Sequence, residues 1–303
     1  APKSFQKKHM KVAFDEFEVG RSKPVALPRG TQPSVVDTVV TAGPSRLEFD
    51  PEDGALLSWQ VDGHEILTGP LRRNYWRALT DNDRGFGNFD PRLQKVLVDT
   101  SWRDVRSSVR RFASGGVGDG ARVLFALRGS MFSRALLWYD VLPDGSFIAH
   151  HELVPRKPMV RLGFTLRLPG VQRVRWLGKG PHENYIDRNH GAWTAIHDLP
   201  LADLHHDYMR PQENGNHTRV RWLEVVGDAA TIRAQDVTGD LLGFTAWPYT
   251  QEALDAAEHI HDLTHSPDTT VNIDRQQRGV GGDTPGVAAL LPAYRMPAGR
   301  RYD

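Results

Sequence analysis

The chain has 303 residues, of which 39% are hydrophobic and 25% are charged, so it is long enough to bury a core without disulfides or metals. Its 38 Lys and Arg residues balance 37 Asp and Glu residues, which excludes the basic field that attracts nucleic acid or anionic membranes. The sequence has no cysteine, which excludes disulfides, thiolate nucleophiles and cysteine-based metal sites. No run approaches the ~20 apolar residues that span a bilayer, so we expect no membrane partner.

The first segment of the chain is basic and irregular and leads into one short predicted strand. Residues 12–19 (Val-Ala-Phe-Asp-Glu-Phe-Glu-Val) are typical of a short strand. A link rich in proline and glycine follows, with Pro24, Pro28, Gly30 and Pro33. We therefore predict a boundary here, with residues 1–32 as the end of one domain plus a linker and residues 33–303 as a second domain.

From about residue 35 onward, short β segments alternate with turn signals. Pro143-Asp144-Gly145 is typical of a hairpin turn, because proline presets φ and glycine accepts a positive φ. Many strands with long loops between them predict an all-β fold, a large antiparallel sandwich. The predicted strands cover residues 35–41, 45–49, 55–61, 122–128, 135–141, 146–153, 160–168, 171–177, 218–226, 230–236 and 241–247.

Residues 250–263 carry a helical pattern, with Leu254, Ala257 and Ile260 at helical spacing. On such a helix His261 and His265 share a face at a spacing that suits metal ligands, and His259 points to another face. The general-base glutamate of a zinc-protease signature is missing between them. We therefore favour packing of these histidines and predict no metal site.

Four loop segments gather aromatic, guanidinium, carboxylate and amide groups, which are the groups that bind sugar hydroxyls and C–H faces. From composition alone, the simpler interpretation is that Arg–carboxylate and Asn contacts pin long loops onto the sandwich. The segments are residues 74–85 (Asn-Tyr-Trp-Arg-Ala-Leu-Thr-Asp-Asn-Asp-Arg-Gly), 177–188 (Leu-Gly-Lys-Gly-Pro-His-Glu-Asn-Tyr-Ile-Asp-Arg), 209–215 (Met-Arg-Pro-Gln-Glu-Asn-Gly) and 279–286 (Gly-Val-Gly-Gly-Asp-Thr-Pro-Gly).

In order and approximate spacing, these four segments resemble the marker stretches of the C-terminal domain of family 2 β-galactosidases, which some heterodimeric members carry as a separate small subunit. The resemblance covers residues 70–290 and implies a supersandwich of the galactose-mutarotase type, with the end of an immunoglobulin-like domain in residues 1–32. It also implies hydrolysis of terminal β-galactosides, such as lactose, by a retaining mechanism whose two glutamates lie on a (β/α)₈ barrel. Nothing in this sequence alternates strand and helix at barrel spacing, so we predict no catalytic residue in this chain.

The resemblance also implies which loops of this chain reach the sugar. The loop at residues 85–88 (Gly-Phe-Gly-Asn) matches a mobile flap over the active site. The other matches the last active-site loop, where Gly286 stands in the position of the Trp on which galactose stacks in the family, so that this aromatic platform is absent. The predicted substrate-binding residues are Gly85, Phe86, Asn88, Gly282, Asp283, Thr284 and Gly286.

Cofactors and partners follow from the same resemblance. It implies Mg²⁺ and Na⁺ in the complete enzyme, with ligands from domains outside this chain, and we expect no cofactor in the chain itself. The expected partners are the barrel-containing part of the enzyme, fused or separate, and a β-galactoside, within an oligomer. We expect a cytoplasmic location, with a periplasmic or secreted one left open.

Two other functions remain open. Because mutarotases share the sandwich, the chain could be a stand-alone sugar epimerase, with His182, Glu183 and Glu213 as candidate acid and base groups. It could instead be a non-catalytic carbohydrate-binding or assembly module. Glu183 and Glu213 are also the tempting pair for hydrolysis, but each lies in a marker segment that is structural in the family.

Overall fold

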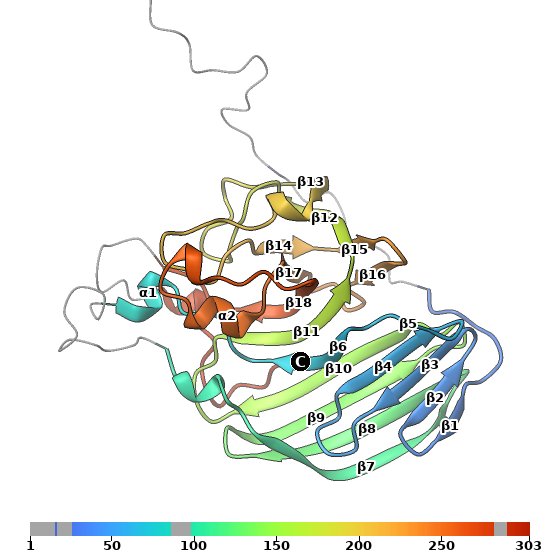
Figure 1. Cartoon of the computed structure of the whole chain (residues 1–303). Helices are drawn as coiled ribbons and strands as arrows, with labels where there is room; N and C mark the ends of the chain where they lie inside the picture. The colour runs from blue at the N-terminus through green and yellow to red at the C-terminus, as the bar shows by residue number, and fades with distance from the viewer. Residues whose placement is uncertain (1–15, 17–25, 86–97, 282–289) are drawn as a thin grey trace, which may run out of the picture.

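The computed structural model describes residue 16 and residues 26–85, 98–281 and 290–303, and within these ranges the protein is built from three antiparallel sheets (Figure 1). The predicted all-β class is thereby confirmed. The described helices are short, and none is long and apolar enough to cross a membrane. They are α1 (Asp81–Arg84), α2 (Gln251–Ala256) and 3₁₀ turns at Thr100–Trp102, Leu201–Asp203, Ile260–Asp262 and Pro292–Tyr294.

The longest sheet runs in the order β1-β2-β3-β4-β6-β11-β18-β17-β14, and β5 pairs with β4. At its centre, β11 lies between β6 and β18. Gly163 of β11 pairs with Asn74 of β6 on one side and with Asp274 of β18 on the other. The strands are β1 (Ser34–Val36), β2 (Val39–Ala42), β3 (Ser45–Phe49), β4 (Leu56–Val61), β5 (His64–Glu65), β6 (Gly69–Asn74), β11 (Arg161–Pro169), β14 (His217–Val220), β17 (Leu242–Trp247) and β18 (Asp268–Gln277).

Two four-stranded sheets cover this long sheet. One has the order β10-β9-β8-β7 and the other the order β13-β12-β15-β16. In Figure 1 they lie at opposite ends of the molecule, with α1 and α2 to one side between them. Their strands are β7 (Ser107–Val117), β8 (Gly120–Gly129), β9 (Phe132–Val141), β10 (Phe147–Pro155), β12 (Val171–Gly180), β13 (Trp193–Pro200), β15 (Trp222–Gly227) and β16 (Thr231–Gln235).

Aromatic contacts show how the layers pack. Phe49 of β3 lies 4.6 Å from Tyr139 of β9 and 6.4 Å from Phe125 of β8, measured between ring centroids, and all three side chains are buried. At the other end, Trp176 of β12 lies 5.3 Å from Phe244 of β17. The long sheet is therefore covered by a different sheet at each end. We call the first core, with Leu47, Phe49, Phe125, Leu137 and Tyr139, the apolar sandwich.

Most predicted strands are confirmed, but two of them are each split. The segment 35–41 turns at Asp37, which has a φ of 52°, so that β1 and β2 form a hairpin. The segment 218–226 breaks into β14 and β15 next to Arg219, whose φ is 55°. β5, β6, β7, β13 and β18 were not predicted from the sequence. The strand predicted at residues 12–19 lies outside the described residues, apart from the exposed Glu16, whose carboxylate contacts Lys179 and Thr194 beside β13.

The helix predicted over residues 250–263 is wrong in length. It ends at Ala256, and Ala257 has an extended backbone with a ψ of 137°. Ile260 is 43% exposed, so the apolar spacing beyond Ala257 does not continue onto the core. His261 and His265 therefore share no helix face. His259, predicted to point elsewhere, stacks on His261 with the ring centroids 5.2 Å apart.

Candidate functional site

The first predicted sugar-facing loop starts from the capped helix α1. Thr80 accepts a hydrogen bond from the backbone N–H of Asp83, and the Asp83 carboxylate accepts one from the backbone N–H of Thr80. The helix ends at Gly85, whose φ of 58° and ψ of −143° are a conformation that favours glycine. Gly85 therefore forms the turn that ends α1. The other two residues predicted for this loop, Phe86 and Asn88, lie outside the described residues.

The second predicted sugar-facing loop starts directly beside the first. The Asn82 side chain donates to the Val280 carbonyl oxygen over 2.9 Å. The Asp187 carboxylate accepts from the backbone N–H groups of Val280 and Gly281, at 3.1 and 2.7 Å. Residues 82–85 and 279–281 therefore form one shared loop base. The predicted residues that follow it, Gly282, Asp283, Thr284 and Gly286, lie outside the described residues.

A buried arginine holds the shared loop base from below. The guanidinium of Arg77 is 0% exposed and makes two parallel contacts with the Asp83 carboxylate, at 3.0 and 2.9 Å. It also donates to the backbone carbonyls of Arg278 and Gly279, at 2.6 and 3.0 Å. Burial alone would lower the pKa of Arg77, but the Asp83 carboxylate outweighs burial and the pKa is raised. Arg77 therefore stays charged and ties α1 to the end of β18.

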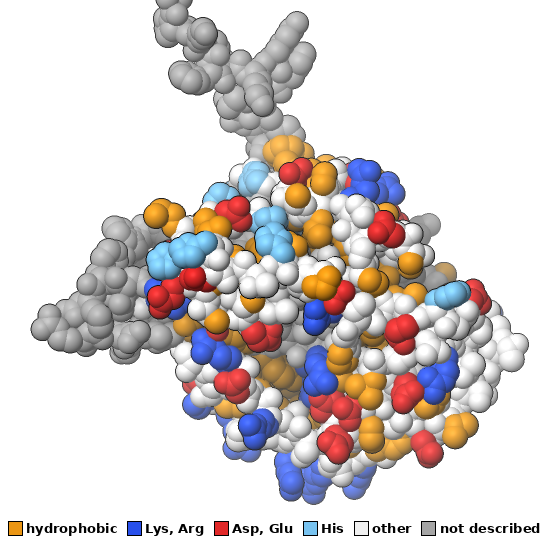
Figure 2. All heavy atoms as spheres, viewed as in Figure 1, with side chains coloured by type: hydrophobic (Ala, Val, Ile, Leu, Met, Phe, Trp, Pro, Cys, Tyr) orange, Lys and Arg blue, Asp and Glu red, His pale blue; other side chains and the backbone are white. Residues whose placement is uncertain are grey.

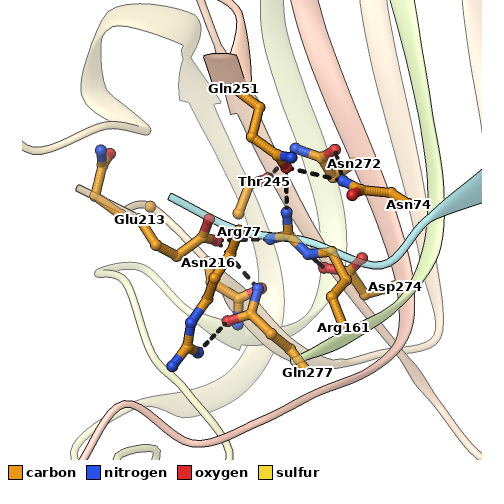
Figure 3. Close-up of polar contacts among 12 residues, drawn as sticks. Asn74, Arg77, Arg161, Glu213, Asn216, Thr245, Gln251, Asn272, Asp274 and Gln277 are labelled. Carbon is orange, nitrogen blue, oxygen red and sulfur yellow. Dashed lines mark hydrogen bonds and ion pairs between the residues drawn. The ribbon is translucent and has the colours of Figure 1, made fainter. Parts of the chain in front are cut away.

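A second buried arginine lies in the middle of the long sheet (Figure 3). Arg161 contacts Glu213 at 2.7 Å and Asp274 at 3.2 Å, and all three side chains are at most 1% exposed. Gln277 donates to the same Glu213 carboxylate over 3.1 Å. We call Arg77, Asp83, Arg161, Glu213 and Asp274 the arginine cluster.

The arginine cluster places three carboxylates against two guanidiniums. Burial raises the pKa of Asp274 to about 7, since Arg161 offsets only part of it and Glu213 adds repulsion. Burial likewise raises the pKa of Glu213, in spite of Arg161 and Arg77. The carboxylate pair therefore keeps a proton to a higher pH than free carboxylates do, which reduces the uncompensated buried charge.

An amide layer extends the cluster to α2 (Figure 3). The Asn74 side chain donates to Gln251 and to Asn272, both over 2.9 Å, and Arg161 donates to the same Gln251 oxygen. Asn272 in turn donates to Thr245 over 2.8 Å. Gln251 of α2 therefore closes this part of the polar face through its hydrogen bonds to Asn74 and Arg161.

Glu183 and Glu213, the tempting carboxylate pair, are both occupied by protein donors. Glu183 accepts from Arg188 and Tyr208, both at 2.5 Å, and from the Gly215 backbone N–H at 2.8 Å. Burial would raise the pKa of Glu183, but the Tyr208 hydroxyl and the other donors outweigh it and the pKa is lowered. Glu213 is buried against Arg161, and His182 is exposed beside Trp193. These environments suit structural contacts better than the shared acid and base work of an epimerase.

A cleft of about 390 Å³ opens next to the amide layer, and Gly85, the predicted substrate-binding residue that the structure describes, does not line it. Figure 2 shows a hollow below α2, with hydrophobic side chains on its floor and Lys or Arg side chains beside it. Neither this cleft nor Arg161 was predicted from the sequence. Arg161 could have been found from its place in the otherwise apolar start of β11. A charged side chain in such a run is buried only together with a partner of opposite charge. The cleft is lined in part by Arg72, Trp76, Arg103, Arg167 and Gln251.

Comparison with known proteins gives three consistent sequence relatives. A β-galactosidase from Priestia megaterium is 33% identical over 264 residues, which cover 84% of this chain and 24% of that protein. One from Vibrio cholerae serotype O1 is 29% identical over 274 residues, covering 85% and 26%. The β-galactosidase 2 of Enterobacter cloacae is 30% identical over 272 residues, covering 84% and 25%. The chain spans about a quarter of the length of these curated relatives.

A solved Escherichia coli K12 protein described as an aldose 1-epimerase superposes with a TM-score of 0.47 at 8% sequence identity, over 88% of this chain and 96% of that chain. Residues 41–303 match the family described as beta galactosidase small chain. The resemblance drawn from the four loop segments is confirmed, and the chain belongs to the β-galactosidase small chain family.

Proposed function

We propose that this chain is the C-terminal part or small subunit of a β-galactosidase that hydrolyses terminal β-galactosides, such as lactose, with retention. The family match and the quarter-length coverage of the relatives support this proposal. The remaining three quarters of such an enzyme supplies the barrel with both catalytic glutamates. This chain supplies loops to the active-site wall.

The shared loop base is the observation that carries the proposed role. Arg77, Asn82 and Asp187 fix the starts of both predicted sugar-facing loops to one another. Because catalysis depends on sub-ångström placement of groups around the substrate, a wall built from two loops needs a common rigid support. The support consists of buried charge-assisted contacts, which hold one geometry better than apolar packing does.

Retention of configuration requires two carboxyl groups about 5–5.5 Å apart that flank the sugar. Glu213 has no exposed surface on its side chain, and Glu183 accepts three hydrogen bonds from protein donors. Neither carboxylate is available to a glycosidic bond in this arrangement. The proposal therefore assigns both catalytic groups to the rest of the enzyme.

The partners and ions of the complete enzyme belong to the same proposal. The barrel-containing part is the obligatory partner, and the assembled enzyme is an oligomer. Its Mg²⁺ and Na⁺ bind to ligands outside this chain. The buried carboxylates Asp83, Glu213 and Asp274 face guanidiniums instead, so they offer poor ligands for a hard cation.

Turnover of a chromogenic β-galactoside tests the proposal. We expect the chain alone to show no turnover above buffer, and the mixture with the remaining polypeptide of the enzyme to show full activity. Glu183→Gln and Glu213→Gln serve as matched variants in the isolated chain. Enzyme-like turnover by the isolated chain that either variant abolishes would overturn the proposal.

The same preparation distinguishes the two alternatives. Faster mutarotation of freshly dissolved α-galactose than in buffer, followed by optical rotation, would identify an epimerase. Calorimetric binding of galactose or lactose with a dissociation constant well below ~10 mM, without any turnover in the mixture, would identify a carbohydrate-binding module. We expect neither result.

A further inference from the structure

Three potential metal ligands that lie apart from the loop base gather at residues 259–262 (His-Ile-His-Asp). One donor atom from each of His259, His261 and Asp262 lies within 4.8 Å of the other two. The Nδ1 atom of His259 is 3.5 Å from Asp262 Oδ2, and the Nε2 atom of His261 is 3.6 Å from Asp262 Oδ1. Figure 2 shows histidine side chains at the surface beside α2.

These spacings are close to those that a bound transition metal requires. A tetrahedral zinc ion with bonds of about 2.0–2.1 Å to nitrogen and oxygen holds its ligand atoms about 3.3 Å apart. The two nitrogen-to-oxygen distances, each to a different oxygen of the Asp262 carboxylate, exceed that value by 0.2 and 0.3 Å. The two exposed imidazoles, which are now nearly parallel, must turn out of their stack for both nitrogen lone pairs to point at one ion.

The backbone around the three ligands is already ordered for this arrangement. The 3₁₀ turn Ile260–Asp262 is closed by the hydrogen bond from the Asp262 N–H to the His259 carbonyl oxygen at 3.0 Å. The Asp262 carboxylate accepts from the backbone N–H groups of Glu258 and His259, at 3.2 and 2.9 Å. The His259 and His261 rings stack with an interplanar angle of 14°. Ion binding therefore needs little ordering of the chain.

We propose that His259, His261 and Asp262 bind one divalent transition-metal ion of the zinc class. Two imidazoles and one carboxylate suit Zn²⁺, Ni²⁺ or Co²⁺, whereas Mg²⁺ and Ca²⁺ prefer oxygen ligands throughout. The side chains are between 42% and 81% exposed, so an ion reaches them directly from solvent. With three protein ligands, one position remains for water or for a donor from another molecule. The site is independent of the proposed galactosidase role.

Isothermal titration of the 303-residue chain with ZnCl₂, in a preparation without a polyhistidine tag, tests the proposal. We expect one equivalent of Zn²⁺ to bind at pH 7.5. His259→Ala and His261→Ala each weaken binding by at least ~10-fold, because loss of a ligand costs more than loss of a supporting group around it. Affinity falls at lower pH, because a metal ion competes with protons for its ligands.

His64→Ala is the matched control, since His64 is an exposed histidine on β5 that lies outside the cluster. It leaves Zn²⁺ binding unchanged. Circular dichroism checks that all variants keep the wild-type fold, and visible absorption of the Co²⁺-loaded chain reports ligation directly. Wild-type titrations without saturable heat, or equal binding by the double variant His259→Ala/His261→Ala, would overturn the proposal.

Discussion

The apolar sandwich and the arginine cluster lie on the same long sheet, but they stabilise it in different ways. In the apolar sandwich, Phe49, Phe125 and Tyr139 bury their rings against each other, and each such side chain contributes roughly 1.5–3 kcal/mol by leaving water. That contribution is not directional. In the arginine cluster, Arg77 and Arg161 are buried with three carboxylates, and removal of these charges from water offsets much of their attraction.

The difference shows what the cluster is for. Replacing buried ion pairs by well-packed apolar residues is often neutral or stabilising, so stability alone does not account for the arginine cluster. Its contacts end on backbone carbonyls of Arg278 and Gly279 and on the helix cap of α1, where they set positions. The apolar sandwich holds the sheets together, and the arginine cluster holds the loops in place.

The largest expected effect comes from removing a guanidinium without its partners. Arg161→Met leaves Glu213 and Asp274 buried without their counter-charge, and we expect the free energy of unfolding to fall by about 3–5 kcal/mol at pH 7.5. Urea denaturation measures it. Arg233→Ala is the control, because it breaks an exposed pair with Glu224 and costs about 0–1 kcal/mol. Equal losses for the two variants would contradict the picture of a buried, mutually dependent cluster.

A substitution that creates a cavity in the apolar sandwich tests stabilisation without charge. Leu137→Ala removes a side chain that is 0% exposed, and we expect a loss of about 3 kcal/mol in urea denaturation. This loss stays constant between pH 5 and pH 8, because no titrating group is involved. The loss for Arg161→Met shrinks at pH 5, where the unpaired carboxylates take up protons. The same pH dependence in both variants would show that the two regions are not stabilised differently.

The raised pKa of Asp274 predicts a third effect, a contribution to stability that changes with pH. Its folded pKa of about 7 lies above the ordinary value of 3.8, so between these values the folded chain binds the proton that the unfolded chain has lost. This contribution to stability is complete below about pH 4 and is lost as the pH rises towards 7, by at most about 1.4 kcal/mol per pH unit.

Asp274→Asn isolates the contribution of Asp274. The difference in unfolding free energy between wild type and this variant should drift with pH from 4 to 7 in favour of the variant, and level off above pH 7. Urea denaturation at half-unit pH steps measures it. A difference that is constant across this range would mean that Asp274 is ionised throughout.

Strands were predicted correctly from the sequence where one face of the strand is apolar and the other is polar. The β9–β10 hairpin followed from alternation and from Pro143-Asp144-Gly145, and Gly145 has the expected positive φ of 87°. β18 was missed because Asn272 and Asp274 point into the polar network, and hydrophobic periodicity does not recognise a buried polar residue. The helix over residues 250–263 was overextended since spacing alone does not reveal that Ile260 faces solvent.

The candidate site was likewise predicted only in part. The four loop segments indicated the family, because their order and residue types are specific even without a fold. The shared loop base was not predicted, since the contact between Asn82 and Val280 joins residues 198 positions apart. Pairings of this kind depend on tertiary structure, which local patterns do not encode.

The smallest stability effect should accompany a clear change in activity. Asn82→Ala removes the donor that joins the two loops at Val280, and we expect a loss of about 0.5–1.5 kcal/mol, typical of one hydrogen bond. On the proposed function, kcat/KM of the complete enzyme for a chromogenic galactoside falls on the order of 10-fold, because displaced loops no longer position the sugar. Ser146→Ala removes a hydrogen bond to Asp144 in the distant hairpin and serves as the control for stability. If both variants keep wild-type kcat/KM, the shared loop base orders the loops without shaping the active site. If only Asn82→Ala lowers kcat/KM, the positioning role proposed for the shared loop base holds.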